Sequence, residues 1–383
     1  MSFRPGIETL VAIHPEWLRG HRVGLVAHPA SVTTQGRHAA DFLRDAGIHL
    51  VALFGPEHGF TGRGGAGEAI CDGRHTGTGL PIFSLYGDTR KPTTAMLRDV
   101  DLIVFDLHDL GARPYTYVST LRLVLEAAAE NGKAVVVADR PIPLPLVTDG
   151  PLLDPAFESF VGLVRTPVAY GMTPGETARF LAADLGLKLD LHVAAMDGFE
   201  RAPPAAPEPW IPPSPAIRSP ACAACFPATV FFEALPAVDH GRGTDAPFTR
   251  VGAPWADALA LADALSEFRL PGLRVEPTIY AAGTGTYKGQ TVRGLQLNIT
   301  DPAAFRPVQT GISLIHVIQQ MYGREVLWDA PGARAGFFDQ LMGTDSVRLA
   351  LLDGEEPAVI AGSWRDAWAG FPGKRQSALL YRG

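Results

Sequence analysis

Short, dense runs of apolar residues alternate with helical patterns in the first half of the chain. Four such runs span residues 22–27, 49–54, 101–107 and 133–138. Runs of this length and density are typical of strands that are buried on both faces of a parallel sheet. Between the third and fourth runs lies a stretch (residues 121–128) whose apolar residues recur at helical spacing, with Gly132 as a stop signal. The alternation predicts a doubly wound α/β domain with helices on both faces of the sheet.

The second half of the chain has a different pattern. Thr173-Pro174-Gly175-Glu176 is a capping box with proline at the first helical position, and it predicts a helix that ends near Leu185. Residues 203–220 then contain eight prolines, which excludes regular helix and central strand. We expect an ordered strap and not a free linker, because Trp210 and Ile211 lie within it. The patterns after it predict an α+β domain, with helices near 256–268 and 312–321 and strands near 275–280 and 294–299. The expected division is therefore an α/β domain over residues 1–200, a proline-rich strap over 201–240 and an α+β domain over 241–383.

Composition narrows the functional classes. The chain has 383 residues with a net charge of −7 and no basic cluster, which argues against binding to nucleic acid or to an anionic membrane. Three cysteines are too few for a secreted disulfide framework. We find no export signal at the start and no apolar stretch long enough to span a membrane, so the expected location is the cytoplasm.

Several motifs fail in their context. Residues 62–67 match G-x-G-x-x-G, but they lie seven residues beyond the second apolar run, and a glycine-rich stretch follows them instead of a helix. Cys222 and Cys225 form a C-x-x-C pair without the second pair that a zinc ribbon needs. Asp106 and His108 could hold a divalent metal, but carboxylates at strand ends more often hold loops together. No phosphate-binding loop and no G-x-S-x-G elbow is present. We therefore expect neither a cofactor nor a metal.

The remaining candidate for the chemistry of this chain is catalysis by carboxylate side chains. Ligands of open α/β sheets bind at the carboxyl ends of the strands, and charged and aromatic residues follow three consecutive apolar runs. Glu57 and Glu68 lie eleven residues apart in one glycine-rich loop. Paired carboxylates carry out most glycoside hydrolysis, in which one protonates the leaving oxygen and the other stabilises or attacks the anomeric centre. Tyr115, Tyr117 and Trp210 offer flat apolar faces for a sugar ring.

Long motifs along the chain resemble one known family. They are GPEHGF (55–60), AGE (66–68), TGLPIFSLYG (78–87), DLIVFDLHDLGARPYTYVST (101–120), DGPLL (149–153), SFVG (159–162), GMTPGE (171–176), PWIPPSP (209–215), GRGTDAPF (241–248) and GAPW (252–255). In this order they resemble the NamZ-type exo-β-N-acetylmuramidases, from about residue 5 to the C-terminus. The resemblance implies a Rossmann-like parallel-sheet N-terminal domain, a smaller α+β C-terminal domain and an active-site cleft between them. The implied reaction removes a terminal, non-reducing N-acetylmuramic acid residue from peptidoglycan fragments, without a cofactor, in cell-wall turnover and recycling.

Carried over position by position, the resemblance implies that Glu57 and Glu68 are catalytic. The substrate-binding residues that it implies are His58, Asp106, Arg113, Tyr115, Tyr117, Asp139, Arg140, Arg242 and Thr244. Arg63 and His108 are further substrate-binding candidates, because they lie in the same strand-end segments. Arg113, Arg140 or Arg242 would suit the lactyl carboxylate of muramic acid, because a guanidinium can bind a carboxylate through two hydrogen bonds.

This chain departs from the family pattern at several positions. Ile142 and Ala216 stand where the family usually has asparagine, His108 stands where it often has glutamine, and His240 precedes the GRGT motif. We expect Ile142 and Ala216 to weaken recognition of polar groups on the sugar, and His240 to become positive below about pH 6.5.

Two further readings remain open beside an exo-glycosidase for an amino sugar. One is a carbohydrate-binding or sensor protein without hydrolytic activity, and the other is a glycosidase for a specialised-metabolite glycoside. In each case the expected partner is a small carbohydrate.

Overall fold

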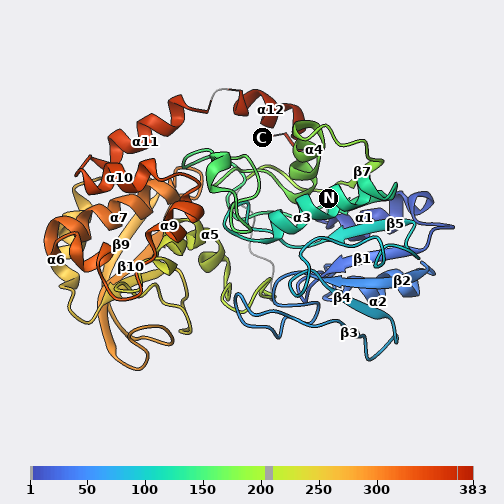
Figure 1. The fold of residues 1–383 in the computed structure, drawn as a ribbon, viewed down its shortest axis with the longest axis horizontal. Coiled ribbons are helices and arrows are strands. Elements are labelled where there is room, and N and C mark those ends of the chain that lie inside the picture. Colours follow the sequence, from blue (N-terminus) through green and yellow to red (C-terminus); the bar gives the residue numbers. More distant parts are fainter. Residues whose placement is uncertain (1–2, 203–209, 369, 383) are drawn as a thin grey trace.

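Two sheets form the framework of the molecule, one in each half of the chain (Figure 1). The computed structural model describes residues 3–202, 210–368 and 370–382. The first half holds a seven-stranded sheet and the second a three-stranded sheet. This arrangement confirms the predicted fold class.

The seven-stranded sheet has the order β3-β4-β2-β1-β5-β6-β7, and all neighbouring strands are parallel except β3 and β4. The strands are β1 (Val23–Ala27), β2 (Leu50–Gly55), β3 (Gly73–Arg74), β4 (Pro81–Ser84), β5 (Leu102–Asp106), β6 (Ala134–Ala138) and β7 (Leu191–Ala194). The four apolar runs correspond to β1, β2, β5 and β6, so these predictions are confirmed. Their carboxyl ends meet at one edge, because Ala27 of β1 lies beside Asp106 of β5 and Val26 lies beside Phe54 of β2.

Helices cover both faces of this sheet. Leu25 and Val104 pack with α1 (Gly6–Ile13) and α2 (Ala39–Asp45), while Val26 and Phe105 point to the opposite face. There they join a core that includes α3 (Tyr117–Glu130) and α4 (Pro174–Asp184). The capping box is present, with the Thr173 hydroxyl accepting from Glu176 N–H while the Glu176 carboxylate accepts from Thr173 N–H. Two short 3₁₀ helices are η1 (Pro15–Trp17) and η2 (Pro155–Phe157).

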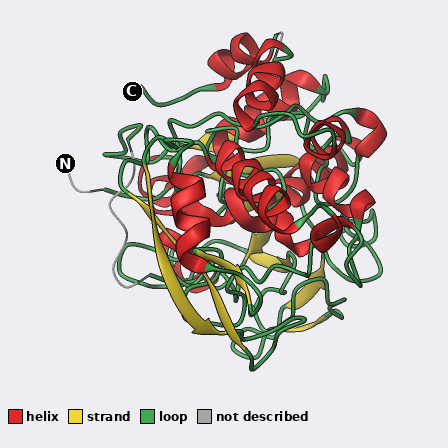
Figure 2. Cartoon of the chain, turned by 90° about the vertical axis from the view of Figure 1, so that its left-hand side faces the viewer, coloured by secondary structure: helices red, strands yellow, loops and turns green. Residues whose placement is uncertain are grey.

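The second half contains an antiparallel sheet of order β8-β10-β9, with helices to one side of its long strands (Figure 2). Its strands are β8 (Arg250–Ala253), β9 (Leu273–Ala281) and β10 (Thr291–Ile299). The helices of this half are α5 (Pro220–Thr229), η3 (Val230–Glu233), α6 (Ala258–Ser266), α7 (Pro307–Tyr322), α8 (Glu325–Trp328), α9 (Ala335–Met342), α10 (Ser346–Leu352), α11 (Pro357–Asp366) and α12 (Phe371–Ala378). The predicted helices near 256–268 and 312–321 correspond to α6 and α7, and the two predicted strands correspond to β9 and β10.

The proline-rich segment is anchored to the first sheet where the structure describes it. The hydroxyl of Tyr117 donates to the carbonyl of Pro213 (2.7 Å), and Nδ1 of His28 donates to the same oxygen (3.0 Å). Trp210 Nε1 donates to Ile217 O at 2.9 Å. Residues 203–209 lie outside the described residues. The strap expected over 201–240 is too long, because residues 220–233 are helical and pack against α7 and α9.

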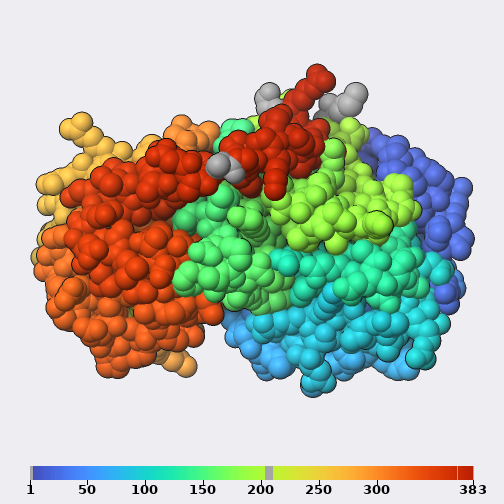
Figure 3. Space-filling view, turned by 45° about the horizontal axis from the view of Figure 1, so that its top comes forward, coloured from blue at the N-terminus to red at the C-terminus, as the bar shows by residue number. Residues whose placement is uncertain are grey.

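The end of the chain returns to the first half. Helix α12 packs against α4, and the Tyr381 hydroxyl donates to the buried carboxylate of Asp139 at 2.6 Å. The backbone N–H of Leu380 donates to the buried Glu176 carboxylate at 2.9 Å. In Figure 3 the C-terminal residues cross from one half of the molecule to the other. Among the described residues, no helix combines the length and apolar character needed to cross a membrane.

Candidate active site

A cavity of about 480 Å³ lies between the two halves of the molecule. The first half contributes residues that follow β2, β4 and β5, and the second half contributes residues of α5, η3, α9 and the loop before β8. The lining residues that carry the argument are Glu57, Tyr86, Arg90, Glu233, Arg242 and Arg334. One wall of the cavity is therefore formed at the strand ends where the sequence predicted a site. The opposite wall, from the second half of the chain, was not predicted.

The turn after β2 presents Glu57 to this cavity. Gly55 has no room for a side chain, because a Cβ there would lie 2.4 Å from the backbone nitrogen of Phe60. His58 adopts a φ of 69°, which is rare for a residue with a side chain, and its Nδ1 donates to Gly64 O at 2.9 Å. Strained backbone of this kind is common at functional sites. The tight turn places Glu57 and His58 together in the wall of the cavity.

Both carboxylate oxygens of Glu57 accept hydrogen bonds. Gly67 N–H donates to Oε1 at 2.8 Å, and the Thr116 hydroxyl donates to Oε2 at 2.6 Å. The Tyr86 hydroxyl also faces Glu57, and the pKa of Tyr86 is raised by burial and by the charge of Glu57. These donors fix the position of the Glu57 carboxylate in the cavity wall.

Glu233 is a second carboxylate in the same cavity, and sequence reasoning missed it. Its Oε1 lies 2.9 Å from Nη2 of Arg242. Burial raises the pKa of Glu233, the negative charge of Glu57 raises it further, and Arg242 and Arg334 partly offset the rise. One signal was available, since Glu233 is the only charged residue between Arg218 and Asp239 and stands within an apolar stretch.

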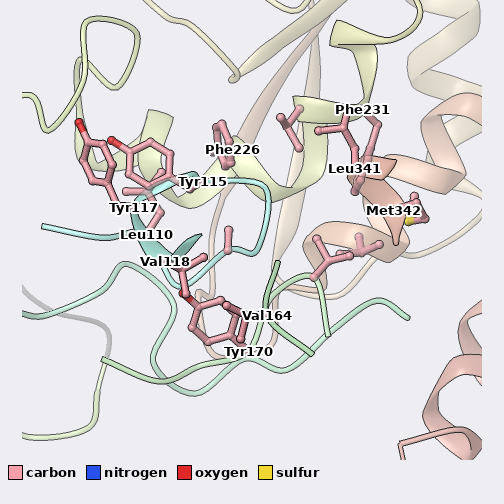
Figure 4. Packing of buried hydrophobic residues seen from close by; sticks show 14 of the residues in the cluster. Leu110, Tyr115, Tyr117, Val118, Val164, Tyr170, Phe226, Phe231, Leu341 and Met342 are labelled. Atoms are coloured by element: carbon pink, nitrogen blue, oxygen red, sulfur yellow. The ribbon is translucent and has the colours of Figure 1, made fainter. Parts of the chain in front are cut away.

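Aromatic rings form the apolar wall of the cavity. Tyr115 packs edge to face against Phe226 of α5 with ring centroids 5.5 Å apart (Figure 4). Phe226 in turn contacts Phe248 at 5.0 Å, and the guanidinium of Arg242 lies 5.5 Å from the Phe248 ring centroid. These buried rings pack on one another and support the apolar side of the cavity.

Five of the residues singled out from the sequence line the cavity, namely Glu57, His58, Tyr115, Tyr117 and Arg242. Eight others do not, namely Glu68, Arg63, Asp106, His108, Arg113, Asp139, Arg140 and Thr244. The predicted set is therefore split, and the reasons differ from residue to residue.

Asp106, Arg140 and Asp139 are buried at the sheet edge and are engaged with the protein. Nη2 of Arg140 donates to Asp106 Oδ2 at 2.9 Å, so this pair holds two strand ends together. The carboxylate of Asp139 accepts from Gly175 N–H at 2.8 Å, from Thr173 and from Tyr381. Burial raises the pKa of Asp139 to about 6. These residues position the loops and have no free face toward the cavity.

Arg113 is fully buried and binds backbone carbonyls. Its Nη1 donates to Pro151 O (3.1 Å) and to Thr166 O, and its Nη2 donates to Met342 O in α9. Burial lowers the pKa of Arg113 to about 9. Arg113 therefore connects the two halves, and the expectation that it binds a substrate carboxylate is corrected.

Glu68, Arg63, Thr244 and His108 also lie away from the cavity. Glu68 is exposed and accepts from Gly65 N–H at 2.6 Å, which closes a turn of the glycine-rich loop. Arg63 is exposed in the same loop. The Thr244 hydroxyl donates to Gly241 O at 2.6 Å. The imidazole of His108 stacks edge to face on Trp210 at 5.5 Å, and burial lowers its pKa to about 3.

The departures from the family pattern fall in separate places. Ala216 lines the cavity that contains Glu57, but Ile142 is 1% exposed and lines another cavity of about 500 Å³ together with His108 and Trp210. Ile142 and Ala216 therefore do not lie in one cavity. His240 does not become a cation near pH 6.5, because burial and the charge of Arg242 lower its pKa to about 3.

Within residues 3–202, 210–368 and 370–382, no group of three or more histidine, cysteine or acidic side chains could hold a metal. Cys222 and Cys225 are buried in α5 as free thiols, and burial raises the pKa of Cys225 to about 12. A thiol with this pKa is a poor metal ligand and a poor nucleophile at neutral pH.

Comparison with known proteins gives one consistent family. Residues 23–221 match the family model described as "Exo-beta-N-acetylmuramidase NamZ, N-terminal", and residues 224–381 match the corresponding C-terminal model. The chain is 35% identical to the peptidoglycan β-N-acetylmuramidase NamZ of Bacillus subtilis, over 98% of this chain and 91% of that protein. Two crystal structures of DUF1343 family proteins from Bacteroides fragilis are similar to it. One has a TM-score of 0.90 and 32% identity and covers 99% of each chain, and the other has a TM-score of 0.80 and 26% identity and covers 100% of this chain and 99% of that one.

Proposed function

The chain belongs to the NamZ family of exo-β-N-acetylmuramidases and is a glycoside hydrolase, and on this premise we propose that it removes N-acetylmuramic acid from the non-reducing end of peptidoglycan fragments. The relative from Bacillus subtilis is named for this activity on peptidoglycan. A role in the turnover of cell-wall fragments follows from that substrate.

The observation that carries the proposal is a pair of carboxylates with unlike surroundings in one cavity. Glu57 accepts hydrogen bonds on both oxygens, whereas burial raises the pKa of Glu233. A buried carboxyl group with a raised pKa can serve as the proton donor of a glycosidase, and a second carboxylate in the same cavity can act at the anomeric carbon.

The reaction divides between these two groups. Glu233 in its protonated form donates its proton to the glycosidic oxygen while the bond between that oxygen and the anomeric carbon breaks. The carboxylate of Glu57 faces the positive charge that develops at the anomeric carbon. Water supplies the new hydroxyl group, and its proton passes to a carboxylate of the pair. Arg242 lies 2.9 Å from Glu233 and can stabilise this group once the proton has left.

The size of the cavity favours release of one terminal sugar. Its volume of about 480 Å³ lies in the range of sites that enclose a single small ligand. The buried rings of Tyr115, Phe226 and Phe248 make one wall of the cavity apolar. A site that encloses one sugar favours attack at a chain end over attack within a chain.

Two isomeric disaccharides test the proposal. With purified protein, we expect free N-acetylmuramic acid from a β-linked disaccharide that carries this sugar at its non-reducing end. We expect no cleavage of the reversed disaccharide, in which N-acetylglucosamine occupies that end. Product from the reversed disaccharide, or from neither, would overturn the proposal, and the second result would favour a binding protein without hydrolytic activity.

A further inference from the structure

Three arginines line the catalytic cavity, and two of them are engaged with the protein. Arg242 pairs with the carboxylate of Glu233 at 2.9 Å. Nη2 of Arg334 donates to the backbone oxygen of Glu233 at 2.8 Å, and its guanidinium lies over the ring of Phe337. The third arginine, Arg90, has neither a carboxylate nor a carbonyl partner among the residues that the structure describes.

Two aromatic rings fix the position of the Arg90 guanidinium. Its central carbon lies 4.8 Å from the ring centroid of Tyr86 and 4.4 Å from that of Phe160. The two rings are 5.5 Å apart, and both line the cavity. Cation–π contacts of this kind restrain the guanidinium without using its N–H donors, so these donors are available to a ligand.

Tyr86 connects Arg90 with the catalytic carboxylate. Its ring carries Arg90, and its hydroxyl faces Glu57. Only the side chain of Tyr86 therefore separates Glu57, which the anomeric carbon of a sugar would approach, from the guanidinium of Arg90.

The charge balance of the cavity suits an anionic ligand. Three guanidinium groups, of Arg90, Arg242 and Arg334, line the cavity together with only two carboxyl groups, of Glu57 and Glu233. N-acetylmuramic acid differs from N-acetylglucosamine by a lactyl ether with a carboxylate at its end. An unpaired arginine can bind this carboxylate through two parallel hydrogen bonds.

We propose that Arg90 binds the lactyl carboxylate and thereby sets the preference of the site for muramic acid over N-acetylglucosamine. This inference rests on the proposed function for the identity of the sugar. It assigns to Arg90 the role that the sequence suggested for Arg113, Arg140 or Arg242, each of which is engaged in the structure.

Binding of two free sugars tests the inference without requiring hydrolysis. The dissociation constants of N-acetylmuramic acid and N-acetylglucosamine are measured by titration calorimetry for the wild-type protein and for Arg90→Gln, Arg90→Lys and Arg98→Gln. Arg98 is an exposed arginine outside the cavity and serves as the matched control. A melting curve for each variant shows that it is folded.

We expect the wild-type protein and Arg98→Gln to bind N-acetylmuramic acid more tightly than N-acetylglucosamine. Arg90→Gln should weaken binding of N-acetylmuramic acid by about 10- to 100-fold and leave binding of N-acetylglucosamine unchanged. Arg90→Lys keeps the charge but lacks the planar guanidinium, so its affinity for N-acetylmuramic acid should lie between those of the wild-type protein and Arg90→Gln.

Three results would overturn the inference. They are equal affinity of the wild-type protein for both sugars, a preference that survives in Arg90→Gln, and an equal loss for both sugars in that variant. None of them depends on cleavage of the disaccharides, so a failure of this inference and a failure of the proposed function give different results.

Discussion

Glu57 and Glu233 are two carboxyl groups with different neighbours in one cavity. The donors around Glu57 come from Gly67 and Thr116, and the neighbours of Glu233 are Arg242 and the apolar wall. An enzyme whose proton donor must be protonated loses activity as the pH rises through the pKa of that donor. A raised pKa of the donor moves this loss of activity to higher pH.

We therefore predict that Glu233→Gln lowers kcat by about 100-fold or more and removes the loss of activity on the alkaline side of the pH profile. The measurement is kcat against pH on a chromogenic β-N-acetylmuramide. Glu267→Gln, at an exposed position outside the cavity, is the matched control and should keep the wild-type profile. An alkaline limb that persists in Glu233→Gln would assign the proton donor elsewhere.

Asp109 gives a stability prediction at the same scale. It is buried, its Oδ2 accepts from the Tyr170 hydroxyl at 2.7 Å and from Gly111 N–H at 3.1 Å, and its Oδ1 is buried without a partner among the described residues. Burial raises its pKa to about 6. Because the pKa in the folded state lies above the unfolded value of about 3.9, this group lowers stability as pH rises from about 4 to about 7.

Asp109→Asn keeps an oxygen for the two hydrogen bonds and removes the buried charge. We predict that the variant is more stable than the wild-type protein at pH 8, by on the order of 2 kcal/mol, and equally stable near pH 4. Denaturant unfolding at the two pH values measures this difference. A variant that is less stable at pH 8 would show that the ionised carboxylate has a favourable role in the folded protein.

At the scale of elements, Arg113 joins loops and helices that are far apart in the sequence. Its guanidinium binds carbonyls that precede and follow the Asp154–Glu158 turn, and a third carbonyl at the end of α9. Gly343, which follows α9, leaves room for the guanidinium, because a Cβ at this position would lie 2.3 Å from Arg113 Nη2. The wall of the cavity that α9 supplies depends on this connection.

Arg113→Met should therefore lower the free energy of unfolding by about 3–5 kcal/mol, because it leaves buried carbonyls without donors. Denaturant unfolding followed by circular dichroism gives the value. Arg98→Met, at an exposed position, should change stability by no more than about 0.5 kcal/mol. A small effect of Arg113→Met would mean that water replaces the guanidinium.

The sequence predicts best those elements that have a continuous apolar run or a complete capping motif. The four apolar runs became central strands because both faces of each are buried, and the capping box started α4 where expected. Strands β4 and β7 escaped prediction, because each has only four residues and most of them are half-buried. The length of the strap was overestimated because prolines continue into α5, where Pro220 occupies the first turn.

At the scale of the whole molecule, the cavity exists only because two halves of the chain meet. The position of Glu57 in the cavity could be expected, since Glu57 follows a buried strand within a recognisable motif. Glu233 and Arg90 were not, because their role depends on which distant segments pack opposite them. Arg113 and Asp139 were misjudged for the same reason, since their partners at Met342 and Tyr381 lie more than 200 residues away.

The end of the chain contributes to this assembly. Tyr381 and Leu380 bond to Asp139 and Glu176 of the first half, and the core is continuous from the first sheet to α12. The two walls of the cavity are thus held in one arrangement in which Glu57 and Glu233 face the same space.

The most direct test of this account is the rate at which Glu57→Gln releases the chromophore from a β-N-acetylmuramide, measured beside the wild-type protein and Glu68→Gln. Glu68 lies in the same loop but outside the cavity. We predict that wild-type protein and Glu68→Gln turn over at similar rates, and that Glu57→Gln is slower by about 100-fold or more with an unchanged melting temperature. Turnover by Glu57→Gln at the wild-type rate, or a wild-type protein that releases no chromophore, would contradict the account.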